Sequence, residues 1–185
     1  MLIIILLIVV VPIVLIGLFL MSAYNGLVGF RQAVKNAWAQ IDVQLTRRHD
    51  LIPNIVNTVK GYAGHEKGTL EAVMNARAKA TSVTLPADKI KAEGELSTAL
   101  GRLLAVSEAY PDLKANQNFM ALQEELTSTE NRVAYARQFY NDSVTKLNTA
   151  IQTFPTVVIA GMFGFKEEPF FETPTEEKKA PIVQF

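Results

Sequence analysis

Residues 2–21 read LIIILLIVVVPIVLIGLFLM, a run that contains no charged side chain. About 20 residues of α-helix reach about 30 Å, which is the thickness of the hydrocarbon core of a bilayer. Pro12 and Gly17 do not oppose a membrane helix, because both residue types are tolerated there. The run therefore predicts a transmembrane anchor over residues 1–23.

A cleaved signal peptide is the alternative to an uncleaved anchor. Such a peptide has a basic N-terminal region, a shorter apolar core and small residues before the cleavage site. Here no Lys or Arg precedes the apolar run, and Met21 stands where a small residue is needed. A lipoprotein site would require cysteine, which the chain lacks. We therefore expect that the anchor is not removed.

Basic residues lie on one side of the anchor only. The nearest ones are Arg31, Lys35, Arg47 and Arg48, and all of them follow the apolar run. The positive-inside rule then places the N-terminus outside and the body of the chain in the cytoplasm. We expect a single-pass membrane protein with the lipid bilayer as its first partner.

Composition excludes several classes of function. The 18 Lys and Arg residues balance the 18 Asp and Glu residues, whereas a nucleic-acid-binding protein carries an excess of positive charge. The absence of cysteine removes thiol chemistry, and two histidines leave little for a metal site. His65 and Glu66 begin like a zinc-protease helix, but Thr69 stands where the second histidine is required. No Walker-type loop or Gly-x-Ser-x-Gly motif occurs. We expect no enzymatic activity, no catalytic residue, no cofactor, no metal and no nucleic-acid partner.

The body of the chain shows helical periodicity. From Leu27 to Val59 the apolar residues fall on one face of a helix, so the first helix is expected to continue out of the membrane without a break. Further apolar stripes predict helices over about 65–81, 87–109 and 113–153. Two long and two short helices suit an all-α, up-and-down antiparallel four-helix bundle over residues 24–154. A three-rod bundle, with the two short helices end to end, is the alternative.

Several charged and amide side chains fall on or beside these apolar stripes. Charges in such positions are usually paired when buried, because an isolated buried charge is costly. We expect Arg48 and Arg77 to be buried and paired with carboxylates, most simply those of Glu108 and Glu130. Long side chains that snorkel at the bundle surface, or a catalytic site, are the alternatives. The predicted polar network consists of Arg48, Glu66, Arg77, Glu108, Glu130, Arg137 and Asn141.

The end of the chain differs from the bundle. Residues 155–171 are rich in Gly and Phe and too short to span a bilayer as a regular helix. This segment is expected near the membrane or a subunit interface, or packed on the bundle, and residues 172–185 are expected to form a flexible tail. If the short helices cover only part of the long ones, apolar side chains are left over and predict a homo-oligomer. The predicted interface consists of Leu27, Phe30, Val34, Tyr135, Phe139, Phe163 and Phe165.

The residue pattern resembles the LemA family over about residues 24–165. The motifs that carry this resemblance are YNGLV (24–28), WAQIDVQL (38–45), RHDLIPN (48–54), VKGYAGHE (59–66), YPDLKAN (110–116) and TENR (129–132). The resemblance implies a bacterial inner-membrane protein with one N-terminal membrane helix and a cytoplasmic up-and-down helical bundle. It implies no known activity or cofactor, and one branch of the family is tied to building the magnetosome membrane.

Two functions fit these observations. The first is a non-enzymatic protein that self-associates and scaffolds or shapes the bacterial cytoplasmic membrane. The second is a membrane-tethered adaptor that binds another protein, such as a membrane protease or a signalling partner.

Overall fold

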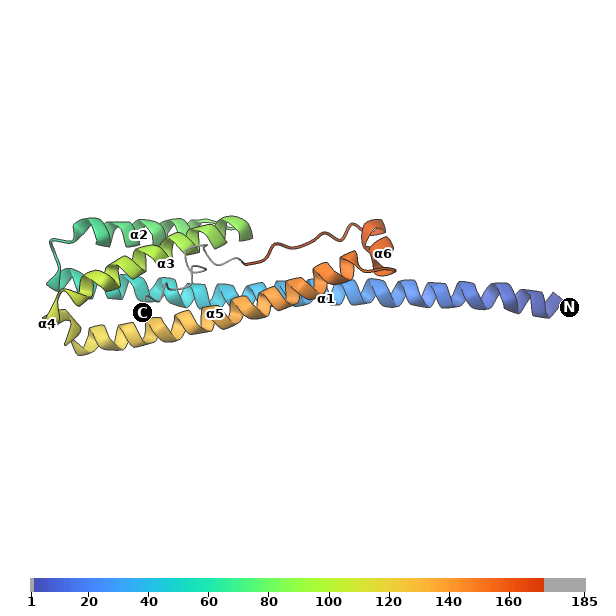
Figure 1. Ribbon diagram of the computed structural model, residues 1–185, viewed down its shortest axis with the longest axis horizontal. Helices are drawn as coiled ribbons and strands as arrows, with labels where there is room; N and C mark the ends of the chain where they lie inside the picture. Colours follow the sequence, from blue (N-terminus) through green and yellow to red (C-terminus); the bar gives the residue numbers. More distant parts are fainter. Residues whose placement is uncertain (1, 172–185) are drawn as a thin grey trace, which may run out of the picture. The chain divides into compact units, whose positions relative to one another are not determined.

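The structure is a computed structural model that describes residues 2–171, and within that range it is helical and contains no strand (Figure 1). The prediction of an all-α fold is confirmed. The predicted flexible tail, residues 172–185, lies outside the described residues. The helices are α1 (Leu2–Tyr62), α2 (Lys67–Ser82), α3 (Pro86–Glu108), α4 (Pro111–Lys114), α5 (Gln117–Gln152) and α6 (Thr156–Met162).

Helix α1 runs from the apolar run into the body without a break, as the periodicity predicts. Within residues 2–171, it is the one helix that is long and apolar enough to cross a membrane. The side chains from Ile8 to Met21 are exposed, whereas from Leu27 onward an apolar stripe is buried against other parts of the chain. The same helix therefore presents an exposed apolar surface in its first part and a buried apolar stripe in its second part.

The chain forms two compact units, and α1 and α5 contribute to both. The first unit comprises residues 2–39 and 138–170. The second unit comprises residues 40–137 and Phe171.

The second unit is an up-and-down bundle of the later part of α1, α2, α3 and the first part of α5. Helices α2 and α3 lie side by side (Figure 1), so the end-to-end arrangement of the two short helices is wrong. The core is built from apolar side chains of all four helices, among them Ile52, Val73, Leu103 and Phe119. Apolar residues at helical spacing bury one stripe per helix, which explains why the bundle forms.

The last long helix begins later than its apolar stripe predicts. Pro111 opens the short helix α4, and α5 begins only at Gln117. The reason is a cap: the side-chain oxygen of Asn116 accepts a hydrogen bond of 3.0 Å from the backbone N–H of Phe119. An Asn at this position satisfies a backbone donor that the first turn leaves free.

In the first unit, α6 and the chain after it pack against α1. The ring of Phe163 lies 4.7 Å from the ring of Tyr24, and the ring of Phe165 lies 5.9 Å from it. Gly164 has a φ of 69°, and the N–H groups of Gly164 and Phe165 bond the carbonyls of Gly161 and Ala160. This is a Schellman ending, in which glycine takes the left-handed position without strain.

The extended chain after α6 is bound to α5. Both groups of the Asn148 amide are used, because the nitrogen donates to the Glu168 carbonyl and the oxygen accepts from the Glu168 N–H, each at 3.0 Å. The Tyr140 hydroxyl donates to the Pro169 carbonyl at 2.9 Å. Burial of this phenol, with a further contribution from the charge of Glu168, raises the pKa of Tyr140 to about 12. The hydroxyl therefore stays a hydrogen-bond donor at physiological pH.

Candidate functional site

The second unit contains a buried polar cluster to which all four of its long helices contribute. We call it the Arg48 cluster. Its members are Arg48 and His49 of α1, Arg77 of α2, Glu93 and Ser97 of α3, and Glu130 of α5.

Arg48 is the centre of this cluster and its side chain has no exposed surface. One terminal nitrogen donates to both carboxylate oxygens of Glu130, at 2.8 and 3.1 Å, and to the Ser97 hydroxyl at 3.0 Å. The other terminal nitrogen forms an ion pair with Glu93. The planar guanidinium suits this role because its donors point in several directions at once. A single side chain of α1 is thus bound to both α3 and α5.

Glu93 shares its two oxygens between two residues of α1. One oxygen pairs with Arg48, and the other lies 2.8 Å from Nε2 of His49. Burial alone would raise the pKa of Glu93, but the hydrogen bond from His49 and the charge of Arg48 outweigh burial and hold that pKa below its ordinary value. Glu93 is therefore ionised, and because an ionised carboxylate only accepts, His49 is the donor.

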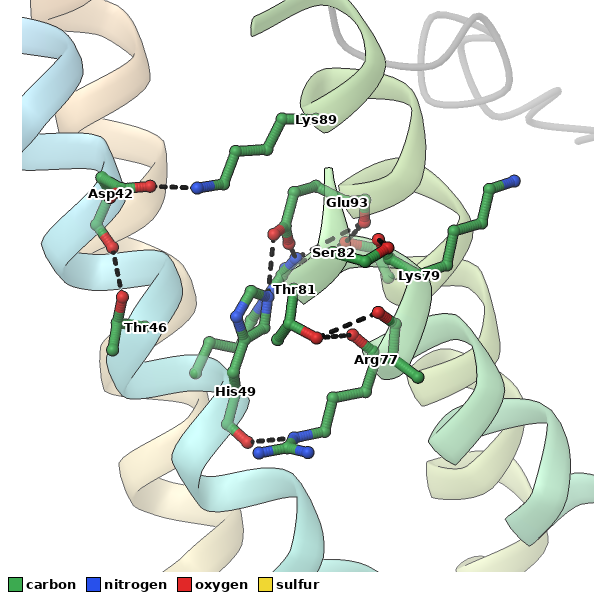
Figure 2. A network of polar contacts seen from close by, with 12 residues as sticks. Asp42, Thr46, His49, Arg77, Lys79, Thr81, Ser82, Lys89 and Glu93 are labelled. Atoms are coloured by element: carbon green, nitrogen blue, oxygen red, sulfur yellow. Dashed lines mark hydrogen bonds and ion pairs between the residues drawn. The ribbon is translucent and has the colours of Figure 1, made fainter. Parts of the chain in front are cut away.

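Arg77 joins α2 to the same place through the backbone. Its Nε donates to the carbonyl oxygen of His49 at 2.7 Å, and Figure 2 shows Arg77 reaching this carbonyl while the His49 ring faces Glu93. Lys89 of α3 pairs with Asp42 of α1 beside the cluster. A surface pair between Arg47 and Glu125 at 2.6 Å links α1 to α5 as well.

The geometry indicates what this cluster does. Arg48 and Glu93 are fully covered, whereas Glu130 has 38% of its side chain exposed and Arg77 and Ser97 are half-buried. A substrate would have to displace a buried ion pair to reach these groups, whereas the pairs hold the helices at fixed heights along one another. Among residues 2–171 no group of three or more His, Asp or Glu side chains is arranged to hold a metal ion.

The structure brings together only part of the predicted polar network. Arg48 and Glu130 meet, and Arg77 lies beside them on a backbone carbonyl rather than on a carboxylate. Glu108 is exposed, so its expected pairing with an arginine is wrong. Glu66, Arg137 and Asn141 lie outside the Arg48 cluster. The Tyr110 hydroxyl lies 3.5 Å from Glu66, Arg137 stacks on Phe171 at 4.5 Å, and Asn141 is half-buried in the first unit.

The predicted network did not include Glu93, His49 or Ser97. Periodicity does place Glu93 on the apolar stripe of α3, but it does not show which residue Glu93 meets. His49 and Ser97 carry no comparable signal, because their roles depend on the height at which α3 lies against α1.

The residues of the predicted interface fall into two groups. Leu27, Val34 and Phe165 are buried within the chain, with 1%, 5% and 8% exposure, so Leu27 and Val34 do not lack neighbours as the predicted interface requires. All three residues belong to the first unit, in which α6 and the segment after it pack against α1. Phe30, Tyr135, Phe139 and Phe163 are exposed.

An open groove lies between α1 and α2 in the second unit. Its volume is about 590 Å³, and Pro53, Val56, Leu70 and Met74 give it an apolar floor. Lys60, Lys67 and Glu71 line it as well.

A model of the LemA family matches residues 37–185, a range that includes the whole Arg48 cluster. The chain belongs to the LemA family. Membership of this family, together with the apolar part of α1, supports a membrane-associated helical protein.

Three LemA-family relatives show how far this similarity extends. The chain is 25% identical to the magnetosome protein MamQ of Magnetospirillum gryphiswaldense over 191 residues, which cover 89% of this chain and 70% of the relative. It is 24% identical to the protein LemA of Metamycoplasma hominis over 155 residues, which cover 83% and 71%. It is 33% identical to the magnetosome protein MamQ 2 of Paramagnetospirillum magneticum over 81 residues, which cover 44% and 30%. None of these names is that of an enzyme.

Proposed function

We propose that this LemA-family protein is a non-enzymatic scaffold that self-associates at the bacterial cytoplasmic membrane and shapes it. The N-terminus lies outside, α1 crosses the inner membrane once, and the helical body lies in the cytoplasm. Arg31, Lys35, Arg47 and Arg48 support this orientation, because cytoplasmic flanks carry the excess of Lys and Arg.

Exposed aromatic side chains on the body are the observation that carries self-association. Tyr135 and Phe139, with 74% and 50% exposure, are four residues apart in α5, a spacing that places them on one face of a helix. Phe30 of α1 is 39% exposed. Large apolar side chains grouped on a surface commonly mark an interface, and repeated contacts of one kind build a ring or a filament.

The Arg48 cluster supports the same proposal. A scaffold must transmit contacts through a body whose helices do not slide, and buried ion pairs favour one register over others. Similarity to proteins named as magnetosome proteins is consistent with a role at a membrane that is being shaped.

Charge placed on the exposed aromatic residues tests this proposal. The full chain in mild detergent should form a homogeneous assembly much larger than its 20.4 kDa, measured by light scattering after gel filtration. Phe30→Glu combined with Phe139→Glu should reduce it to a monomer while helicity by circular dichroism is retained. Ala39→Glu with Thr145→Glu is the matched control, because both positions are exposed and lie on other sides of the same helices.

A monomer in mild detergent and in native membranes alike would contradict self-association. The adaptor function would then take its place, and the groove between α1 and α2 is the observation that favours it. Its apolar floor suits an apolar segment of a membrane protease or a signalling protein, and Lys60, Lys67 and Glu71 in its lining offer charges of both signs for pairing.

A further inference from the structure

We infer that the turn formed by residues 154–163, which joins α5 to the chain that follows α6, inserts into the lipid interface beside α1 and gives the protein a second contact with the bilayer. The inference rests on the proposed membrane anchoring and extends it. The partner is the bilayer itself, at the boundary between headgroups and acyl chains.

The turn lies within an uncharged stretch of the chain. Residues 147–165 contain no Asp, Glu, Lys or Arg, and Lys146 and Lys166 flank this stretch. A segment at the membrane surface needs an uncharged apolar centre, and basic residues at its edges can meet lipid phosphates. The stretch is too short and too rich in turns to span the bilayer, so it would lie in the interface.

Within the first unit, the position of the turn along α1 follows from the contact between α1 and α5. The rings of Trp38 and Tyr140 lie 5.4 Å apart, which fixes the height at which α5 passes α1. Gln152, the last residue of α5, is 12 positions after Tyr140, so equal rise along two antiparallel helices brings it level with Gly26 of α1. The turn therefore lies at the height where the apolar run of α1 ends.

Aromatic contacts agree with this height. Phe163 lies 4.7 Å from Tyr24, the residue just after the predicted anchor, and Tyr is common at the membrane interface. Phe165 lies farther along, with Arg31 at 4.9 Å over its ring. Along the axis of α1, the chain after α5 thus comes nearest to the apolar run around α6. It then runs back toward the first charged residue of α1.

The turn exposes several large apolar side chains. Ile159 and Ala160 of α6 are buried, and they hold the turn on the unit. Other apolar side chains of the turn are exposed: Phe154 78%, Val158 55%, Met162 72% and Phe163 57%. The patch continues the exposed apolar surface of α1, whose side chains from Ile8 to Met21 require lipid. One solvent, the bilayer, satisfies both surfaces, and a separate protein partner is not needed.

A shallow apolar turn beside a spanning helix takes up space in one leaflet only. Interfacial helices sink about 5–10 Å into the boundary of headgroups and acyl chains. The turn would therefore widen the cytoplasmic leaflet next to each anchor, which is a physical means by which a scaffold bends a membrane.

Tryptophan fluorescence tests the inference on the full chain. Trp38 is the only tryptophan, and Trp38→Phe keeps an aromatic ring against Tyr140 in a background that has no other reporter. Met162→Trp or Val158→Trp is then introduced, and the protein is placed in nanodiscs of phosphatidylcholine and phosphatidylglycerol at one chain per disc. Lipids brominated near the top or near the end of the acyl chain report depth, and iodide reports contact with water.

The expected result is blue-shifted emission that bromine near the top of the acyl chain quenches most and iodide hardly quenches. Phe139→Trp is the matched control, because position 139 is also exposed but lies about 20 Å farther along the helix axis. Its emission should be quenched by iodide and not by brominated lipid.

Two results would overturn the inference. The first is quenching of the Met162→Trp and Val158→Trp variants by iodide to the same degree as the control. The second is protection from iodide without quenching by brominated lipid, which would mean that protein covers the turn. With one chain per disc the outcome does not depend on self-association, so the failure of either proposal is seen separately.

Discussion

Arg48 and Glu93 form an ion pair in which neither side chain has any surface exposed to solvent. Arg47, the preceding residue, forms its own pair with Glu125, but there the side chains are 47% and 44% exposed. Two consecutive arginines thus place the same kind of interaction in two very different environments. In the first environment the loss of one partner leaves a buried charge, and in the second it does not.

The first prediction compares the two arginines. Arg48→Ala should lower the free energy of unfolding by about 3–5 kcal/mol, because the buried Glu93 would lose its ion-pair partner. Arg47→Ala should lower it by less than about 1 kcal/mol. Denaturant unfolding of the full chain in mild detergent, followed by circular dichroism, measures both. Equal and small losses would mean that the Arg48 cluster has no role in stability.

The second prediction concerns acid. The folded-state pKa of Glu93 is lowered, whereas a glutamate in the unfolded chain titrates near about 4.3. The unfolded state therefore binds the proton first as the pH falls. The stability from Glu93 is fully present above about pH 5 and is lost as the pH falls through the folded-state pKa.

The measurement is the unfolding midpoint as a function of pH. Glu93→Gln should be less stable at neutral pH and should show a shallower loss in acid than the wild type. Glu125→Gln is the control, because its pair with Arg47 lies at the surface. An acid slope for Glu93→Gln that matches the wild type would contradict the assignment.

The third prediction concerns Gly164, whose φ of 69° lies in the left-handed region. Gly164→Ala should destabilise the end of α6 by roughly 1–2 kcal/mol, because a Cβ crowds the following carbonyl in that conformation. Gly161→Ala is the matched control, since Gly161 is helical and has open space at its Cβ position. It should be neutral or mildly stabilising. Protease sensitivity around residues 163–170 reads out the effect, and equal sensitivity of the two variants would refute it.

The fourth prediction concerns orientation. A reporter fused after Phe185 should be active only if that reporter works in the cytoplasm, because the basic flank of the anchor lies on the body side. Alkaline phosphatase and a fluorescent protein that matures only in the cytoplasm make a complementary pair. Phosphatase activity of the fusion would show that the body lies outside.

The helices could be predicted because their signals are local. The apolar stripe from Leu27 to Val59 reports the continuous helix, since each buried position recurs at helical spacing. The split between α4 and α5 was not predicted, although Asn116 stands at the position of a cap. The apolar stripe continues across the split, and the stripe alone therefore hides the break.

The polar contacts could be predicted only in part, because periodicity gives the face of a helix and not its height against a neighbour. Periodicity places Glu93 on the apolar stripe of α3 and Glu108 at its margin, but 15 residues separate them, which is about 22 Å along the axis. Only Glu93 lies at the height of Arg48. That height depends on the lengths of the connections and on packing of the whole bundle, and no single helix encodes it.

The two hydrogen bonds between Asn148 and Glu168 have a mechanical consequence for α6. They bind the chain that follows α6 to α5, the helix that precedes α6. Helix α6 is therefore held at both of its ends. A force that lifts α6 away from a surface is then shared by both ends and must break several bonds at once, including that of Tyr140 with the Pro169 carbonyl. The position of the turn along the axis of α1 is therefore fixed. The lengths of α5 and of residues 163–170 determine how far the turn reaches toward the membrane.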